Sequence, residues 1–112
     1  MYDDKLLQQG DVLFCDPEPL VAGHEQNGRR PVLVVSNESF NSHTGLVKVV
    51  AITSTTKTFP TRVKIPKGEI VHGDILTDQE KTIDPEARHV VVKGKLSNDV
   101  IESVISLISK SY

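Results

Sequence analysis

The chain has 112 residues, a formal net charge of −2, one cysteine and no tryptophan, which suits a single domain with a modest core of Val, Ile and Leu. The lone Cys15 excludes an intramolecular disulfide and fits a reducing compartment. No apolar run approaches the ~18 residues of a membrane span, and no signal peptide opens the chain. We therefore predict one cytoplasmic domain over residues 1–112, with residues 1–9 as a loose N-terminal segment.

Apolar, β-branched runs separated by turn residues predict short strands along most of the chain. Pro17 and Pro19 end the first run, so residues 16–29 are expected to form a long loop, which in a small domain is usually functional or disordered. A helical turn is predicted over residues 38–41 and a polar loop over residues 54–60. The predicted strands cover residues 12–15, 32–36, 46–53, 61–65, 70–76 and 89–92, with a short polar segment between the last two.

The C-terminal residues follow a helical period. Apolar side chains recur at helical spacing from Val100 to Ile108, with polar neighbours facing away. Ser97 or Asn98 can cap this helix, and Asp99 favours its positive end. The order of elements predicts a mainly β fold with helices, in which a small curved sheet or partial barrel is covered by a C-terminal α-helix.

Charge is unevenly distributed along the chain. Residues 1–21 hold one basic and five acidic side chains, residues 22–67 hold seven basic and two acidic ones, and residues 68–112 hold five basic and eight acidic ones. The basic middle is suited to attract phosphates while the flanks keep the molecule soluble. The net negative charge alone therefore does not exclude a nucleic-acid partner.

The loop before the second predicted strand has a high density of reactive groups. Between Gly23 and Pro31 lie an imidazole, an acid, an amide and two guanidinium groups: His24, Glu25, Gln26, Arg29 and Arg30. Few of these groups are needed to fold a loop, so they indicate a site. Pro31 restricts Arg30 to an extended backbone, and arginine binds phosphate oxygens bidentately. A surface ion pair is the alternative role for Arg30.

Three segments carry a family resemblance. Gly23–Pro31 resembles the G-[SH]-E-Q-x-G-x-R-P loop of the MazF/PemK/Kid toxins, and Asp78–Asp84 is similar to their D/E/N-Q-x-[RK] segment. Phe40–Gly45 resembles their F-N-x-x-T-G segment, which we interpret as structural. The resemblance covers about residues 10–96 and implies an SH3-like (PemK/CcdB-like) barrel with a C-terminal helix, acting as a homodimer.

The activity that this resemblance implies is that of a sequence-selective endoribonuclease toxin, which inhibits translation and growth by cleaving single-stranded mRNA. The RNA 2′-OH would attack the adjacent phosphate and leave 2′,3′-cyclic phosphate and 5′-OH ends, without a metal or other cofactor. Arg30 would stabilise the transition state, Glu25 would be the base, and Thr53 would hold the phosphate unless it only closes a turn. Two alternatives remain: His24 could share the role of base, or Glu25 could serve only to hold the loop by pairing with Arg30. The identity of the base is therefore left open.

The resemblance also implies a set of RNA contacts. The implied RNA-binding residues are His24, Gln26, Arg29, Ser54, Lys57, Asp78, Gln79 and Lys81. Asp78 and Gln79 would bind the edges of unstacked bases, unless they are only a polar strand terminus. Three basic side chains, Lys57, Arg62 and Lys64, could contact the RNA backbone. The alternative is that lysines on an edge strand only prevent aggregation. Leu76 stands where the Kid branch has a catalytic Arg, which places more weight on Arg30.

The partners implied are single-stranded RNA, a second copy of the chain and an antitoxin with an acidic, partly disordered tail that folds as it binds. No paired-cysteine, His-x-His or HExxH pattern predicts a metal site. One alternative is a non-enzymatic toxin of the same fold that poisons a protein target such as gyrase, as CcdB does. The other is a catalytically silent RNA-binding module.

Overall fold

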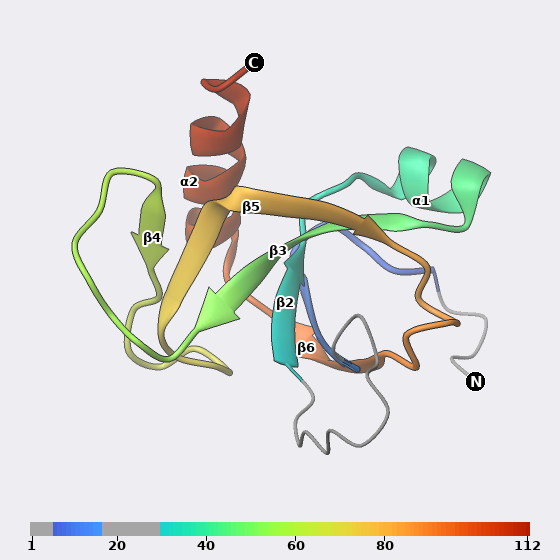
Figure 1. The fold of residues 1–112 in the computed structure, drawn as a ribbon, viewed down its shortest axis with the longest axis horizontal. Coiled ribbons are helices and arrows are strands. Elements are labelled where there is room, and N and C mark those ends of the chain that lie inside the picture. Colours follow the sequence, from blue (N-terminus) through green and yellow to red (C-terminus); the bar gives the residue numbers. More distant parts are fainter. Residues whose placement is uncertain (1–5, 17–29) are drawn as a thin grey trace, which may run out of the picture.

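The computed structural model describes residues 6–16 and 30–112 (Figure 1). Its strands and helices are β1 (Asp11–Cys15), β2 (Arg30–Val34), α1 (Glu38–Thr44), β3 (Val47–Thr53), β4 (Arg62–Lys64), β5 (Asp74–Ile83), β6 (Val91–Lys95) and α2 (Asn98–Ser109). The polar loop predicted over residues 54–60 lies between β3 and β4, and the predicted C-terminal helix is α2, with Ser97 at its N-cap position. The helical turn predicted after β2 is longer than expected, because α1 continues to Thr44.

The described strands form one antiparallel sheet in the order β4-β5-β3-β2-β1-β6. The prediction of a mainly β fold with a C-terminal helix is confirmed, and the sheet stays open between its edge strands β4 and β6. The segment that follows β4 contacts β6 and the residues just after it. Glu69 Oε1 accepts a hydrogen bond from the backbone N–H of Ser97 at 3.1 Å, and Ile70 lies so close to Gly94 that an added Cβ there would be 2.9 Å from its Cδ1.

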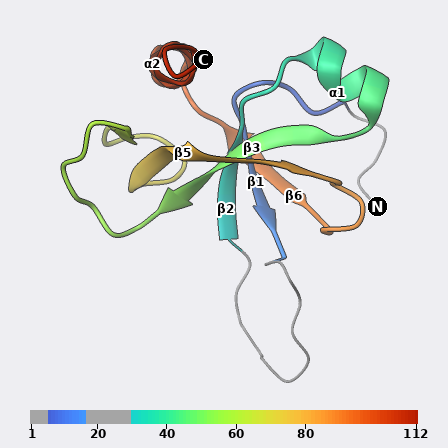
Figure 2. The same cartoon turned by 45° about the horizontal axis from the view of Figure 1, so that its top comes forward.

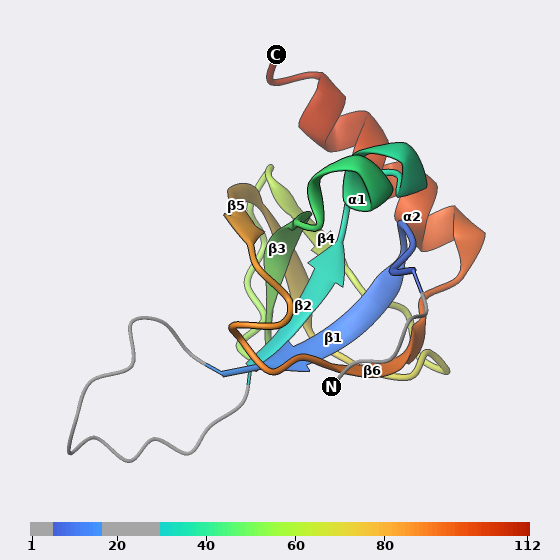
Figure 3. The ribbon, with the colours of Figure 1, turned by 90° about the vertical axis from the view of Figure 1, so that its right-hand side faces the viewer.

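The register divides the side chains between two faces of the sheet, because residues paired across antiparallel strands share a face. One face packs against α2, which stands to one side of the sheet (Figures 2 and 3). The buried residues of this cluster are Val12, Leu33, Val35, Val50, Ile52, Ile65, Ile75, Leu96, Val100, Ile101 and Val104. The second cluster consists of Leu7, Leu13, Cys15, Val34, Val47, Val49, Ile83 and Val90.

Strand β5 differs most from the sequence-based expectation. A strand was expected over residues 70–76 with a polar segment after it, whereas the strand runs from Asp74 to Ile83. The sequence did not predict a strand over its polar residues, because Asp, Gln, Glu and Lys have low strand propensity. In the structure these residues lie on an exposed part of the sheet, where β5 pairs with β3. In Figure 1, β5 changes direction along its length. Likewise, β6 begins two residues later than the strand expected at residue 89.

The expectation of a loose N-terminal segment is wrong for residues 6–9. Leu7 is 2% exposed and belongs to the second cluster, so its side chain anchors this segment in the core. Gln9 Nε2 donates a hydrogen bond to the carbonyl of Val35 at 2.8 Å, and Gln8 Nε2 donates to Glu38 at 2.9 Å. Residues 1–5 lie outside the described residues.

Candidate active site

Several of the predicted site residues lie at the end of the sheet where β2 begins and β3 ends. Thr53 of β3 pairs with Asp74 of β5. The register between β2 and β3 runs from Val34–Val49 to Val32–Ala51, so Arg30 and Thr53 each lie two residues beyond the last pair, at the same end of the sheet. Side chains alternate along a strand and paired residues share a face, so Arg30 and Thr53 both leave the sheet on the face of the Val32–Ala51 pair.

Arg30 is the first residue of β2, and it is exposed. Its partner in the sheet is Cys15, the last residue of β1, so residues 16–29 connect two adjacent positions of the sheet. The proline that follows Arg30 keeps its backbone extended, as the sequence predicted. The strand end therefore presents a permanent positive charge to solvent, on the face of the sheet that carries Thr53.

Thr53 ends β3 and is half-buried. Its Oγ1 accepts a hydrogen bond from the backbone N–H of Thr55 at 3.2 Å, so the hydroxyl does close a turn, as the alternative interpretation held. This bond uses a lone pair of the oxygen and leaves the hydroxyl proton for another acceptor.

The polar loop that follows Thr53 adds two of the predicted RNA-binding residues. Ser54 and Lys57 are both exposed. The backbone N–H of Lys57 donates to Asp74 Oδ2 at 3.0 Å, which fixes this part of the loop beside the Thr53–Asp74 pair. Ser54 and Lys57 therefore lie at the same end of the sheet as Arg30.

The other predicted residues on β5 lie farther along the sheet. Leu76 pairs with Ala51 and Glu80 pairs with Val50, so the residues between them bulge out of the ladder. Those residues are Thr77, Asp78 and Gln79. Asp78 and Gln79 are exposed within this bulge, and not at a strand terminus as the alternative interpretation held.

Lys81 is exposed beyond this bulge and pairs with Val49, on the same face as Thr53. Val49 precedes Thr53 by four residues, roughly 13 Å at the rise of a strand. A single-stranded RNA of several nucleotides, rather than one nucleotide, would be needed to contact both Lys81 and Arg30.

Four predicted site residues lie outside the described residues: His24, Glu25, Gln26 and Arg29. Their roles, including the choice between Glu25 and His24 as the base, remain predictions. The structure nevertheless places both ends of the segment that carries them beside the site, through the pairing of Cys15 with Arg30.

Two charged residues at this site, Arg62 and Asp74, have an internal role that the sequence did not indicate. Arg62 was expected to follow an RNA backbone, but its Nη1 lies 3.2 Å from Asp74 Oδ2 and its side chain is 19% exposed. Asp74, whose side chain is 4% exposed, was assigned no role. The only sequence signal for the role of Asp74 was its position as an acid at the start of an apolar run. Its pairing with Arg62 could not be predicted from the sequence, because Arg62 belongs to another strand.

Among residues 6–16 and 30–112, no three His, Cys, Asp or Glu side chains are grouped so that they could hold a metal ion. In the same part of the chain, no helix is long and apolar enough to cross a membrane.

Comparison with known proteins places this arrangement in a family. Residues 8–112 match the family model described as PemK-like, MazF-like toxin of type II toxin-antitoxin system. The chain belongs to this family. The endoribonuclease toxin MazF of Escherichia coli K12 is 33% identical over 95 residues, which span 85% of this chain and 84% of that protein. The predicted family and its endoribonuclease class are therefore confirmed.

Solved structures agree with this assignment. The crystal structure of MazF (form I) from Deinococcus radiodurans superposes with a TM-score of 0.81 at 31% identity, and covers 96% of this chain and 97% of that chain. An endoribonuclease in complex with its cognate antitoxin, from a mycobacterial species, gives a TM-score of 0.77 at 25% identity, with 94% of this chain and 93% of that one covered. The open sheet described above is thus compatible with the MazF fold.

Proposed function

We propose that this member of the PemK/MazF family cleaves single-stranded RNA at selected sequences, by attack of the RNA's own 2′-OH and without a metal. The observation that carries the proposal is that Arg30, at the start of β2, and Thr53, at the end of the neighbouring β3, lie at one exposed end of the sheet, which also holds Ser54 and Lys57. A permanent cation beside a hydroxyl donor suits a phosphate group whose negative charge grows during the reaction.

The proposed reaction needs two proton transfers around one phosphate. The base, Glu25 or His24, removes the proton of the ribose 2′-OH, whose oxygen then bonds to the adjacent phosphorus. The bond from phosphorus to the 5′ oxygen breaks, that oxygen takes up a proton from Arg30 or from water, and the products carry a 2′,3′-cyclic phosphate and a 5′-OH. Arg30 stabilises the charge of the pentavalent transition state, and Thr53 donates a hydrogen bond to the same phosphate.

The proposed RNA path runs from Arg30 along the face of β3 towards β5. Lys57 and Lys81 would contact phosphates on either side of the cleaved bond, while Asp78 and Gln79 in the β5 bulge would bind base edges. Their position in a bulge supports this role, because bulged residues are freed from the ladder and can be aimed at a ligand.

The proposed protein partners are a second copy of the chain and a cognate antitoxin with an acidic, partly disordered tail. Such a tail would occupy the same cationic surface as RNA and fold as it binds. The solved complex of a relative with its antitoxin supports this partner class. The proposed outcome in the cytoplasm is inhibition of translation and growth when the antitoxin is lost.

The test is incubation of the purified protein with a long single-stranded RNA in EDTA, with the cut ends mapped by sequencing. Wild-type protein should give discrete cuts with cyclic phosphate ends. Arg30→Ala should lower the cleavage rate at least ~10²–10³-fold, because it removes a charged donor to the transition state. Lys67→Ala, at an exposed position of the turn between β4 and β5, is the matched control and should cleave normally.

Three outcomes would argue against the proposal. Cleavage of DNA of the same sequence would exclude the 2′-OH as nucleophile. Growth inhibition that survives Arg30→Ala but is lost on changes in α2 would favour a toxin that poisons a protein target. RNA binding without cleavage, indifferent to Glu25→Ala, would favour the silent binding module.

A further inference from the structure

The loop between β3 and β4 is held in shape by one buried carboxylate. Asp74 Oδ2 accepts hydrogen bonds from the backbone N–H of Lys57 at 3.0 Å and from Arg62 Nη1 at 3.2 Å. The same Arg62 nitrogen donates to the carbonyl of Thr55 at 2.9 Å. The backbone N–H of Arg62 closes the loop by donating to the carbonyl of Phe59 at 3.0 Å. Asp74 and Arg62 thus tie down both the middle and the end of the loop.

Both members of this brace are shielded from solvent, with side chains 4% and 19% exposed. A hydrogen bond between charged groups is shorter and stronger than a neutral one, and a buried carboxylate requires such partners. The loop is therefore fixed before any ligand arrives, which lowers the conformational entropy lost on binding.

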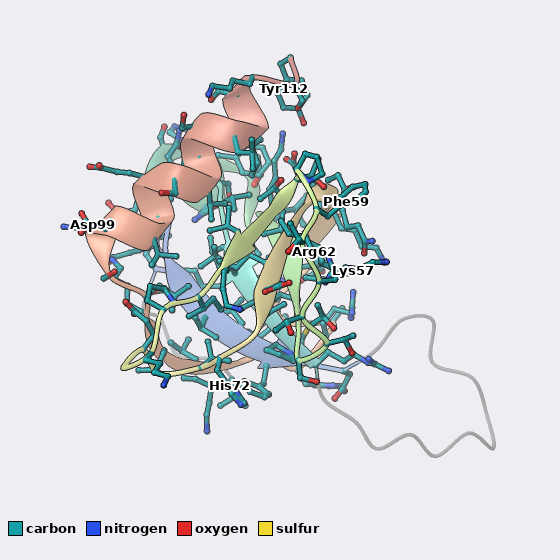
Figure 4. The ribbon with its side chains drawn as sticks, turned by 90° about the vertical axis from the view of Figure 1, so that its left-hand side faces the viewer. Lys57, Phe59, Arg62, His72, Asp99 and Tyr112 are labelled. Atoms are coloured by element: carbon teal, nitrogen blue, oxygen red, sulfur yellow. The ribbon has the colours of Figure 1, made fainter. Side chains whose placement is uncertain are left out.

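The loop presents an aromatic ring to solvent. Phe59 is 51% exposed, whereas Phe14 and Phe40 are half-buried and lie beneath the ammonium groups of Lys93 and Lys48. Phe59 follows the exposed Lys57 by two residues, and Figure 4 shows Lys57, Phe59 and Arg62 together at one margin of the molecule, away from His72 and Asp99. A cation and an exposed aromatic ring on a fixed loop are the elements of a single-strand binding surface.

We propose that Phe59 stacks on an unpaired base of the RNA, and that Asp74 and Arg62 are positioning residues which hold Phe59 and Lys57 for this contact. The inference rests on the proposed function and names a contact beyond it. The loop begins directly after Thr53, so the base on Phe59 would belong to a nucleotide flanking the cleaved phosphate. Because every base has a flat face, this contact adds affinity with little sequence preference.

Affinity measurements on uncleavable RNA test the stacking. A mixed-sequence 2′-O-methyl oligonucleotide blocks the nucleophile, so binding is observed without cleavage. Phe59→Ala should weaken its binding by between about 5-fold and 150-fold, the range measured for loss of one aromatic platform. Phe59→Tyr, which keeps the aromatic face, should bind as wild type does. Equal affinities for all three proteins would overturn the stacking.

Fluorescence gives a direct signal of the contact. The chain has no tryptophan, so F59W introduces the only indole. Titration with the 2′-O-methyl oligonucleotide should quench its emission, because a base stacked on the ring lies within contact distance. V92W is the matched control, since Val92 is 44% exposed on β6, the opposite edge strand, and its emission should not change. An unquenched F59W, or equal quenching of both variants, would contradict the proposal.

Asp74→Asn tests the positioning role, because the amide keeps the shape of the side chain but loses its charge. Circular dichroism should show a folded protein, while hydrogen exchange of the Lys57 amide becomes faster. In cleavage assays KM should rise severalfold with little change in kcat, and Asp74→Glu should restore part of the loss. A folded Asp74→Asn protein with an unchanged Lys57 amide and an unchanged KM would overturn this role.

These measurements separate the two proposals. If F59W is quenched by RNA but wild-type protein cleaves nothing, the stacking contact stands and the nuclease mechanism fails. If wild-type protein cleaves RNA normally but RNA does not quench the emission of F59W, the nuclease mechanism stands and the stacking contact fails. If wild-type protein neither binds nor cleaves RNA, both fail.

Discussion

Single buried polar residues connect elements that are far apart in this chain. Asn41 of α1 is 4% exposed, accepts a hydrogen bond from the Ser36 hydroxyl and donates one to the carbonyl of Leu7 at 2.8 Å. Ser36 Oγ in turn accepts from the backbone N–H of Lys48 at 2.9 Å. Asn41 thereby connects the N-terminal segment with Ser36, which follows β2, and through Ser36 with β3; these bonds support the structural interpretation of the Phe40–Gly45 segment.

The C-terminal Tyr112 provides a prediction on pH dependence. Its hydroxyl donates a hydrogen bond to Glu80 Oε1 at 2.7 Å, and this bond, together with the charge of Glu80, raises the pKa of Tyr112 above its ordinary value of 10.0. Since the folded pKa is the higher one, the bond is present at neutral pH and is lost as pH rises through that pKa. Phenolate absorbance of a Tyr2→Phe protein, in which Tyr112 is the only tyrosine, should show the raised midpoint.

Glu80→Gln in the same Tyr2→Phe background is the comparison. An amide can still accept the hydrogen bond but carries no charge. The titration midpoint of Tyr112 should therefore fall only part of the way towards its ordinary value, because the charge is lost and the hydrogen bond is kept. Identical midpoints with and without the Glu80 carboxylate would show that this contact does not form in solution.

At the scale of elements, β5 decides the geometry of the site. It pairs with both β3 and β4, and its register against β3 shifts between Val50 and Ala51. The shift frees Asp78 and Gln79 from the ladder, while the start of the strand places Asp74 beside Thr53. Gly73, just before the strand, allows this close approach, because a Cβ there would lie 2.1 Å from the carbonyl oxygen of Thr53.

Gly73→Ala should therefore destabilise the protein and disturb the site. Gly73 has φ +124°, which strains any L side chain, and the added Cβ would meet backbone that cannot move without displacing Thr53. We expect a loss of at least about 2 kcal/mol in the free energy of unfolding, measured by urea denaturation. The folded fraction should also cleave RNA more slowly than wild type.

Gly68→Ala separates backbone strain from the steric clash. Gly68 has φ +95°, but a Cβ there meets nothing within 4 Å. Its substitution should cost about 1 kcal/mol and leave cleavage unchanged. Equal losses at Gly68 and Gly73 would mean that the contact with Thr53 has no energetic consequence.

At the scale of the whole molecule, the basic middle of the sequence is only partly available to a ligand. Arg62 pairs with Asp74, and the ammonium of Lys48 lies 5.2 Å from the centre of the Phe40 ring. Arg30 and Lys57 are exposed at one end of the sheet. A protein with a formal net charge of −2 can thus present a local cationic surface.

Salt dependence measures how many of these cations contact phosphates. Binding of the 2′-O-methyl oligonucleotide should weaken linearly with salt on a double-logarithmic plot, because bound cations release counterions from the strand. Lys57→Gln should lower the magnitude of that slope by about 0.7, the value for one phosphate contact on a single strand. Lys67→Gln should leave the slope unchanged. A slope unaffected by Lys57→Gln would place this lysine outside the RNA path.

Much of the fold and part of the site could be predicted from the sequence. The apolar periods located five of the strands and the C-terminal helix, because local burial imposes a local pattern of residues. The residues of the Arg30 loop and Thr53 were selected by their chemistry and by resemblance, and the structure places Arg30 and Thr53 on neighbouring strands. The sequence by itself thus determined the class of the fold, the family and the chemical groups of the candidate site.

Only the tertiary structure decided which groups meet. The continuation of β5 to Ile83, its bulge at Asp78 and Gln79, and the pairing of Asp74 with Arg62 all depend on the register between strands. That register is set by packing between distant segments, and no local period records it. For the same reason Arg62, which resembles a surface cation in the sequence, is an internal brace in the folded protein: its partner is supplied by another strand.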